Sequence, residues 1–139
     1  MEVVPNTYEV EDGVFPFCIG KITIDDFWET FEMALNYWSV EDYERQWREG
    51  LERIKNYDTS CLVASIHDPA KRHYLLWWPL YKEGGKVLIQ NYLFVDELYI
   101  KNIGDRSFTV ENCYEFIPPK KMLTEEGNKI STWIVDLEP

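Results

Sequence analysis

The chain has 139 residues, of which 45% are hydrophobic and 16% aromatic, and its net charge is −11. This length predicts one domain, residues 1–139, and this composition excludes a disordered tail because the chain can bury enough apolar surface to offset the entropy lost on folding. The acidity disfavours a nucleic-acid backbone as the partner, since like charges repel.

The negative charge lies mostly at the start of the chain. Residues 1–42 carry ten acidic side chains against one basic side chain, Lys21, whereas residues 43–139 have a net charge of −2. If these charges share one face of the folded chain, they favour fast association with a basic partner. The alternative is an acidic surface that only keeps the protein soluble.

The first predicted element is an extended segment that reaches about Ile24, with turn signals at Asp12-Gly13 and Pro16. Residues 26–38 then fit two patterns, because helical spacing competes with a strict alternation over Phe31, Met33, Leu35 and Tyr37. The alternation favours a strand from about Glu29 to Tyr37. Its polar residues, among them Thr30 and Glu32, would lie on the opposite face.

The clearest element is a helix over about residues 40–56. Ser39 is a good N-cap with Asp42 three residues later, and one apolar stripe runs through Val40, Tyr43, Trp47, Leu51 and Ile54. On the outer face, oppositely charged side chains four residues apart are expected to pair, as Glu41–Arg45, Glu44–Arg48 and Glu49–Arg53. Because these charges would compensate one another, we do not expect the interface on this face.

Three strands are predicted after the helix, at 60–67, 73–82 and 86–95. Gly84-Gly85 suits a two-residue hairpin turn, because glycine takes positive φ without steric cost. The middle strand is apolar on both faces, as in a strand covered on each side, although Pro79 predicts an edge or a bulge there. The three strands predict an antiparallel meander, residues 60–95, that packs under the helix.

The tail is predicted to contain a strand near Phe108–Cys113, a break at Pro118-Pro119, a turn at Gly127 and an apolar stretch over Ile130–Leu137. Together these elements predict an α+β fold. An antiparallel sheet of about five to seven strands would pack against one main amphipathic helix.

No pattern of catalytic or cofactor-binding residues stands out. Cys61 and His67 share a face of their predicted strand but lie roughly 20 Å apart, and His73 adds no recognisable motif. The three cysteines, including Cys18 and Cys113, fit neither a disulfide framework nor a metal site, so we expect free thiols in a reducing compartment. The chain is thus expected to be no enzyme and to need no cofactor, no metal and no small-molecule substrate.

The N-terminus lacks the basic and apolar regions of a secretory signal. The longest largely apolar run, Tyr74 to Tyr81, is far shorter than the roughly 20 residues that span a bilayer. We therefore expect a cytoplasmic protein without a membrane segment.

Trp28 differs from the other tryptophans because it lies within the acidic residues 25–29. An aromatic side chain in such a cluster is typical of an interface anchor, and partial burial is the alternative. We expect the core instead for Trp47 and for Trp77 or Trp78.

Several motifs follow one another in a recognisable order. An extended acidic segment leads into Leu35-Asn36-Tyr37-Trp38-Ser39, followed by Asp42-Tyr43, Gln46-Trp47, a Leu-rich meander with Trp78 and Gln90-Asn91, and finally Gly127-Asn128-Lys129-Ile130-Ser131 with Trp133. In this order and spacing, the chain resembles the immunity proteins of contact-dependent growth inhibition and related polymorphic toxin systems. The resemblance covers the chain from about residue 20 and leaves residues 1–19 without a counterpart.

The resemblance implies a bacterial protein that binds the C-terminal domain of a cognate toxin, commonly a basic nuclease acting on RNA or DNA, as a 1:1 heterodimer. It also implies an α+β fold with similarity, in some members, to Whirly-type single-strand DNA binders. We therefore predict that the chain inhibits a toxin by occluding its active or substrate-binding surface. The predicted partner-binding residues are Asp25, Asp26, Trp28, Glu29, Glu32, Glu41 and Asp42.

Two alternatives remain open. The first is a Whirly-like module that binds single-stranded nucleic acid, although the bulk charge disfavours it. The second is a small hydrolase, which would have to use His67 or His73.

Overall fold

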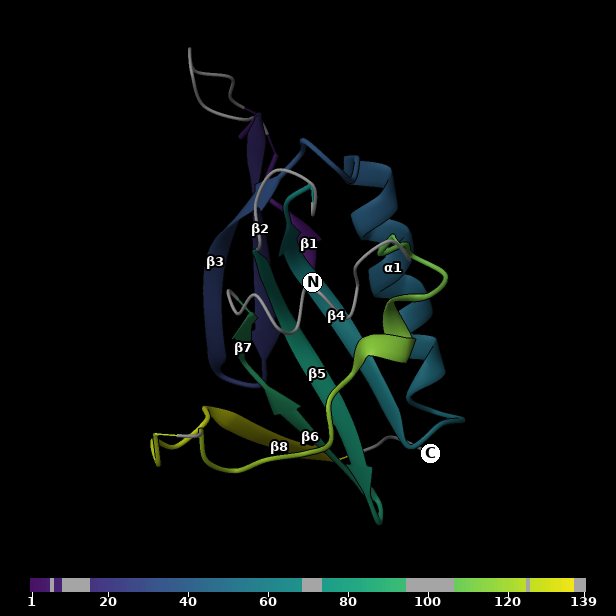
Figure 1. The fold of residues 1–139 in the computed structure, drawn as a ribbon, viewed down its shortest axis with the longest axis vertical. Coiled ribbons are helices and arrows are strands. Elements are labelled where there is room, and N and C mark those ends of the chain that lie inside the picture. Colours follow the sequence, from purple (N-terminus) through teal and green to yellow (C-terminus); the bar gives the residue numbers. More distant parts are fainter. Residues whose placement is uncertain (6, 9–15, 69–73, 95–106, 125, 137–139) are drawn as a thin grey trace.

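The computed structural model describes residues 1–5, 7–8, 16–68, 74–94, 107–124 and 126–136. These residues form a helix, α1 (Val40–Arg53), a short 3-10 helix, η2 (Cys113–Phe116), and two antiparallel sheets (Figure 1). The first sheet has the order β1 (Glu2–Val3), β2 (Phe17–Ile24), β3 (Phe27–Ala34). The second has the order β4 (Thr59–Ile66), β5 (Leu75–Glu83), β6 (Lys86–Gln90), β8 (Thr132–Asp136), and β7 (Tyr92–Phe94) also pairs with β5. The predicted α+β class is confirmed.

The strand β3 shows the alternation that the sequence predicts. Phe31 and Met33 are buried, whereas Thr30 and Glu32 are exposed. The preceding segment is extended as predicted, in β1 and β2, although its turn signal Asp12-Gly13 lies outside the described residues. A strand, and not a helix, therefore carries Glu29 and Glu32.

The end of β3 is set by side chains that bind a distant segment. The Tyr37 hydroxyl accepts a hydrogen bond from the Phe108 N–H (3.2 Å), and Trp38 Nε1 donates to the Phe108 carbonyl (3.3 Å). The strand stops at Ala34, after which Leu35 makes a last backbone bond to Pro16 (2.9 Å) and Tyr37 and Trp38 bond to Phe108. Its predicted extension to Tyr37 is wrong.

The strands β4, β5 and β6 form the predicted antiparallel meander. Gly84 and Gly85 make the two-residue turn between Glu83 and Lys86, and Gly84 has a φ of 60°, which favours glycine. The third predicted strand is interrupted at Asn91. Its first part, β6, pairs with the end of β5, and its second part, β7, pairs with the beginning of β5.

Pro79 lies inside the second sheet. Because β5 has β4 on one side and β6 and β7 on the other, the predicted edge at this position is wrong. Pro79 falls between the residues that pair with β7 and those that pair with β6, so its missing N–H coincides with an existing interruption of the ladder. The irregular register in this sheet occurs in β4, between Val63 and Ser65.

Residues 108–113 form a turn and the start of η2, so the predicted strand Phe108–Cys113 is wrong. The Thr109 N–H donates to Asn112 Oδ1 (2.7 Å), and the Asn112 N–H donates to Thr109 Oγ1 (3.0 Å). Such local bonds compete with a sheet ladder. The apolar residues of this segment are nevertheless in the core, since Phe108 and Val110 are buried.

The remaining predictions for the tail agree with the structure. No regular element occupies Pro118-Pro119, and Gly127 has a φ of 86°. Within the predicted apolar stretch Ile130–Leu137, β8 pairs with β6, and Leu137 lies outside the described residues.

The helix α1 begins as predicted. Ser39 Oγ accepts from the Asp42 N–H (3.2 Å), and Asp42 Oδ2 accepts from the Ser39 N–H (3.0 Å), which completes a capping box. The predicted stripe differs at Leu51, which is 47% exposed, because the buried side consists of Tyr43, Gln46, Trp47, Gly50 and Ile54. The helix ends at Arg53, before the predicted residue 56.

The helix packs across β4, the edge strand of the second sheet. Three of its side chains form hydrogen bonds with the backbone of that strand. Tyr43 Oη accepts from the Ile66 N–H (3.0 Å), and Gln46 Oε1 accepts from the Val63 N–H (2.8 Å). Gln46 Nε2 donates to the Cys61 carbonyl (2.7 Å), and Trp47 Nε1 donates to the Val63 carbonyl (2.7 Å). These bonds satisfy backbone groups that an edge strand otherwise leaves open. We call this side of β4 the closed edge.

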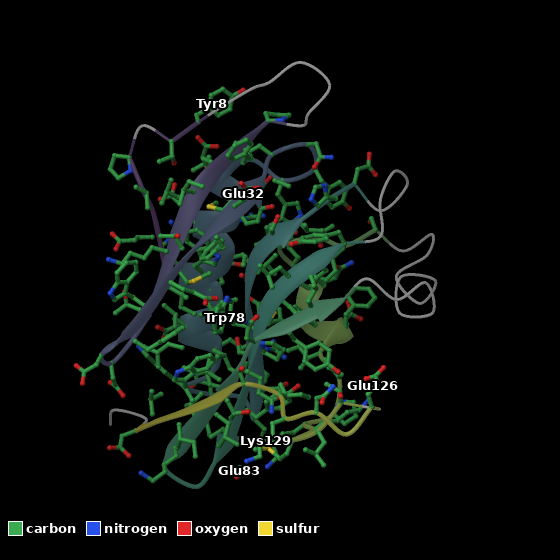
Figure 2. All side chains as sticks on the ribbon, turned by 90° about the vertical axis from the view of Figure 1, so that its left-hand side faces the viewer. Tyr8, Glu32, Trp78, Glu83, Glu126 and Lys129 are labelled. Carbon is green, nitrogen blue, oxygen red and sulfur yellow. The ribbon has the colours of Figure 1, made fainter. Side chains whose placement is uncertain are left out.

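The core lies between the two sheets and under α1. Trp78 lies between the sheets (Figure 2) and packs against Trp133 of β8, with ring centroids 5.5 Å apart. Trp133 in turn packs against Phe27 of β3, at 4.6 Å. Trp47, Trp77 and Trp78 are at most 3% exposed, so their predicted place in the core is confirmed.

Candidate functional site

A tight hairpin joins β2 to β3 and carries three of the predicted binding residues. Asp25 and Asp26 form its two-residue turn, and Asp25 has a φ of 50°. Both aspartates are exposed, and Trp28, two residues later, is 60% exposed. We call Asp25, Asp26 and Trp28 the hairpin tip.

One face of the first sheet points away from the core. Its members alternate with the buried residues of β2 and β3, and the strand register places them side by side. We call this set the outer face: Glu2, Ile19, Lys21, Thr23, Trp28, Thr30 and Glu32. Glu32, labelled in Figure 2, lies on the same face as Trp28, four residues further along β3.

Three of the predicted residues do not belong to the outer face. Glu29 lies opposite Ile22 on the inner side of the first sheet and is partly exposed. Glu41 and Asp42 begin α1, at the other end of β3 from the hairpin tip (Figure 1). The eight residues of β3, at about 3.3 Å each, separate the two ends by roughly 25 Å. Asp42 is also committed to the helix cap.

Within the described part of the chain, none of the six predicted carboxylates has a cationic partner. The ion pairs of this part lie elsewhere, at Arg45–Glu111, Lys55–Glu52, Lys86–Asp136 and Lys120–Glu83. An exposed carboxylate without an internal counter-ion leaves its charge available to a partner. The hairpin tip therefore presents unpaired negative charge beside an exposed indole ring, and Glu32 adds a further unpaired charge four residues along β3.

The outer side of α1 does not form the ion pairs that the sequence predicts. Arg45 bonds to Glu111 instead (2.7 Å), and the Arg53 guanidinium lies over the rings of Tyr57 and Tyr114, at 4.2 and 4.5 Å. Glu111 and Tyr114, which are distant in the sequence, thus take partners that the pattern had assigned to the helix itself. Among the described residues, no ion pair forms at Glu41–Arg45, Glu44–Arg48 or Glu49–Arg53.

The histidines and cysteines show no arrangement typical of a catalytic site. His67 is 4% exposed and its ring packs edge-on against Tyr74, at 4.9 Å, while His73 lies outside the described residues. All three cysteines are free and buried, as predicted for free thiols. Burial, together with the neighbouring Cys113 thiol (Sγ–Sγ 3.9 Å), raises the pKa of Cys61 well above its usual range, which makes a reactive thiolate unfavourable.

The described residues form neither a metal site nor a membrane-spanning helix. No group of three or more His, Cys, Asp or Glu side chains there is placed to hold a metal ion. In the same residues, no helix is long and apolar enough to cross a membrane.

Sequence reasoning missed that Lys21 and Glu2 belong to the outer face. A signal for Lys21 exists in β2, because the inward residues Cys18, Gly20 and Ile22 are small or apolar and alternate with it. Glu2 could not be found in this way, since its place depends on the pairing of β1 with β2, which are well separated in the sequence.

The architecture is that of an α+β protein in which one helix closes the edge of an antiparallel sheet. The family model described as the CdiI N-terminal domain matches residues 33–139. The chain therefore belongs to the CdiI family, the immunity proteins of contact-dependent growth inhibition. The family that the sequence motifs suggested is confirmed.

Two similar proteins extend this finding. The immunity protein CdiI of Enterobacter cloacae is 34% identical over 120 residues, which cover 85% of this chain and 78% of the relative. A chain in the solved CdiA-CT/CdiI toxin and immunity complex from Enterobacter cloacae matches with a TM-score of 0.76 at 30% identity, covering 98% of this chain and 88% of that chain. The structural match thus extends to N-terminal residues for which the motifs provided no counterpart.

Proposed function

We propose that this chain protects a bacterial cell by binding the C-terminal toxin domain of a cognate CdiA protein. Membership of the CdiI family supports this role, and so does the similar structure, which is a complex of a toxin with its immunity protein. The proposal includes a 1:1 complex, action in the cytoplasm and no catalysis by the immunity protein itself.

The observation that carries the proposed mechanism is the unpaired negative charge of the hairpin tip and the outer face. Asp25, Asp26 and Glu32 are exposed and have no internal counter-ion among the described residues. A toxin that acts on RNA or DNA needs basic residues to hold its substrate. Carboxylates placed against those residues would both attract the toxin and occlude its substrate-binding surface.

The seven predicted residues contribute unequally in this mechanism. The hairpin tip forms the centre of the interface, and Glu32 extends the same acidic face along β3 toward its other end. Glu29 lies at its margin. Glu41 and Asp42 reach the toxin only if the interface extends along the whole of β3, roughly 25 Å away.

Charge reversal tests this mechanism. The triple variant Asp25→Lys, Asp26→Lys, Glu32→Lys should associate with the cognate toxin domain at least tenfold more slowly than the wild type. Its association rate should lose most of its dependence on salt concentration. The variant should also fail to protect cells that express the toxin. The matched control is Glu49→Lys, Asp58→Lys, Glu126→Lys, which changes the charge equally at exposed positions away from the outer face.

Binding kinetics at several salt concentrations, thermal unfolding of both variants and growth with induced toxin provide the readouts. If the two triple variants slowed association equally, the net charge of the protein, and not the position of the carboxylates, would determine the association rate. A wild-type chain that neither binds nor protects against the toxin encoded beside it would refute the proposed function itself.

A further inference from the structure

The outer face contains an aromatic–cation pair that neither the fold nor the core requires. The ring of Trp28 is 60% exposed, whereas the tryptophans of the core are at most 4% exposed. The Lys21 ammonium lies 4.9 Å from the centroid of this ring. The two residues come from adjacent strands, since Trp28 pairs with Thr23, two residues after Lys21.

The position of the Lys21 side chain indicates what the Trp28 ring attracts. Lys21 is the sole basic residue among the first 42. Glu2 lies directly opposite it on β1, yet within the described residues Lys21 forms no ion pair and its ammonium lies over the indole instead. The ring thus already binds a cation in the free protein.

The surroundings of the ring favour a cation over an apolar partner. Asp25 and Asp26 lie three and two residues before Trp28, and Glu32 lies on the same face, four residues further along β3. An apolar group docked on the indole would desolvate these carboxylates without pairing them, which is costly. A cationic side chain would contact the ring and lie close to the carboxylates at the same time.

We infer that Trp28 is a cation-binding platform which accepts an arginine side chain of the toxin domain, and that Lys21 occupies this platform until the toxin displaces it. The inference rests on the proposed function. Arginine fits best because its planar guanidinium stacks on an indole while its edge donates hydrogen bonds to carboxylates. Exclusion of water at the interface strengthens both interactions relative to those of the exposed Lys21.

Removal of the competing cation is the first test. Lys21→Met keeps the length of the side chain and deletes its charge, so it should tighten binding of the cognate toxin domain by about threefold to tenfold. Lys129→Met is the matched control, since Lys129 is exposed and forms no ion pair among the described residues. If Lys21→Met bound the toxin domain no more tightly than this control, Lys21 would not compete with the toxin for the Trp28 ring.

Fluorination of the ring is the second test, because fluorine withdraws electron density from the ring face while nearly preserving its shape. With mono-, di- and trifluorotryptophan placed site-specifically at position 28, the dissociation constant should rise stepwise, by about fivefold to thirtyfold in total. The same series at position 133, where the ring packs against Trp78 and Phe27, should show no trend. Thermal unfolding checks that each protein is folded.

The outcomes separate the two proposals. Tight binding with a flat fluorination series at position 28 would leave the toxin-binding function intact and overturn the cation platform. Absence of binding by the wild-type chain would refute the proposed function, whatever the variants do. Weakened binding by Trp28→Leu together with a flat series would show that the indole acts as an apolar anchor.

Discussion

At the scale of single residues, Asp25 is expected to lower folding stability and to favour binding of the toxin domain. Its φ of 50° is a conformation that a residue with a Cβ adopts at a cost, and it adjoins a second carboxylate, Asp26. Asp25→Gly should therefore raise the free energy of unfolding by roughly 0.5–1 kcal/mol. The same change should slow association with the toxin domain, because it removes a charge from the hairpin tip.

Asp26→Asn is the matched control for this prediction. Asp26 does not have a positive φ, so its replacement removes a charge without relieving the backbone. It should slow association as Asp25→Gly does, with a smaller change in stability. Denaturant unfolding and stopped-flow binding measure the two effects, and a stabilised Asp25→Gly variant that still binds at the wild-type rate would argue against the hairpin tip.

Tyr81 should make folding sensitive to alkaline pH. Burial, with smaller contributions from Tyr92 and Cys61, raises the pKa of its phenol to about 12, and its hydroxyl donates to the Pro118 carbonyl (2.8 Å). In the unfolded chain the phenol ionises near its ordinary pKa of about 10. Unfolding therefore releases a proton between pH 10 and 12, so the stability present below pH 10 is lost as the pH rises.

Denaturant unfolding at a series of pH values from 8 to 12 measures this loss. Tyr81→Phe lacks the titrating group and should show a shallower decline over the same range, although it begins from a lower stability because the bond to Pro118 is missing. Identical slopes for both proteins would assign the decline to other groups.

Among the elements, the contact of α1 with β4 depends on Gly50. A Cβ added at this position would lie 2.4 Å from the Cys61 carbonyl oxygen, so α1 would have to move away from β4 and stretch the bonds of the closed edge. Gly50→Ala should reduce the free energy of unfolding by about 1–3 kcal/mol. The higher helix propensity of alanine offsets only part of this loss.

The exposed neighbour Glu49→Ala serves as the control for Gly50→Ala and should change stability by no more than about 0.5 kcal/mol. Denaturant unfolding of both variants provides the comparison. If Gly50→Ala were as stable as Glu49→Ala, α1 would not be held as closely to β4 as the geometry indicates.

Elements that are defined by local sequence could be predicted. The cap of Ser39 and Asp42 fixed the start of α1, and the alternation around Phe31 identified β3. Residues 108–113 could not be predicted as a turn, because their apolar residues alternate as in a strand while Thr109 and Asn112 bond to one another's backbone. Leu51 was misplaced because the side of α1 that faces β4 includes Gln46 and Gly50, which are not apolar residues and so do not appear in an apolar stripe.

The candidate site was predictable only in part for a similar reason. Acidic composition identified the hairpin tip, and alternation placed Glu32 on the face opposite Phe31. The separation of Glu41 and Asp42 from the hairpin tip follows from the extended conformation of β3 between them, which composition does not reveal. The Lys21–Trp28 contact depends on the register of β2 with β3, which is a tertiary property.

For the molecule as a whole, charge makes single-stranded nucleic acid an unfavourable ligand. The net charge is −11, and the carboxylates on the outer face have no counter-ion among the residues that the structure describes. An anisotropy titration with labelled single-stranded DNA at moderate salt should show no binding, because a stacking platform also needs a basic groove to hold phosphates. Saturable binding that weakens with salt would restore the Whirly-like alternative.

The closed edge has a consequence for how this protein can change over generations. Tyr43, Gln46 and Trp47 bond to N–H and carbonyl groups of β4, which every amino acid except proline supplies in full. These hydrogen bonds therefore do not depend on which side chains β4 carries, and the hairpin tip takes no part in them. A transplanted β2–β3 hairpin could then redirect the same framework to a different toxin.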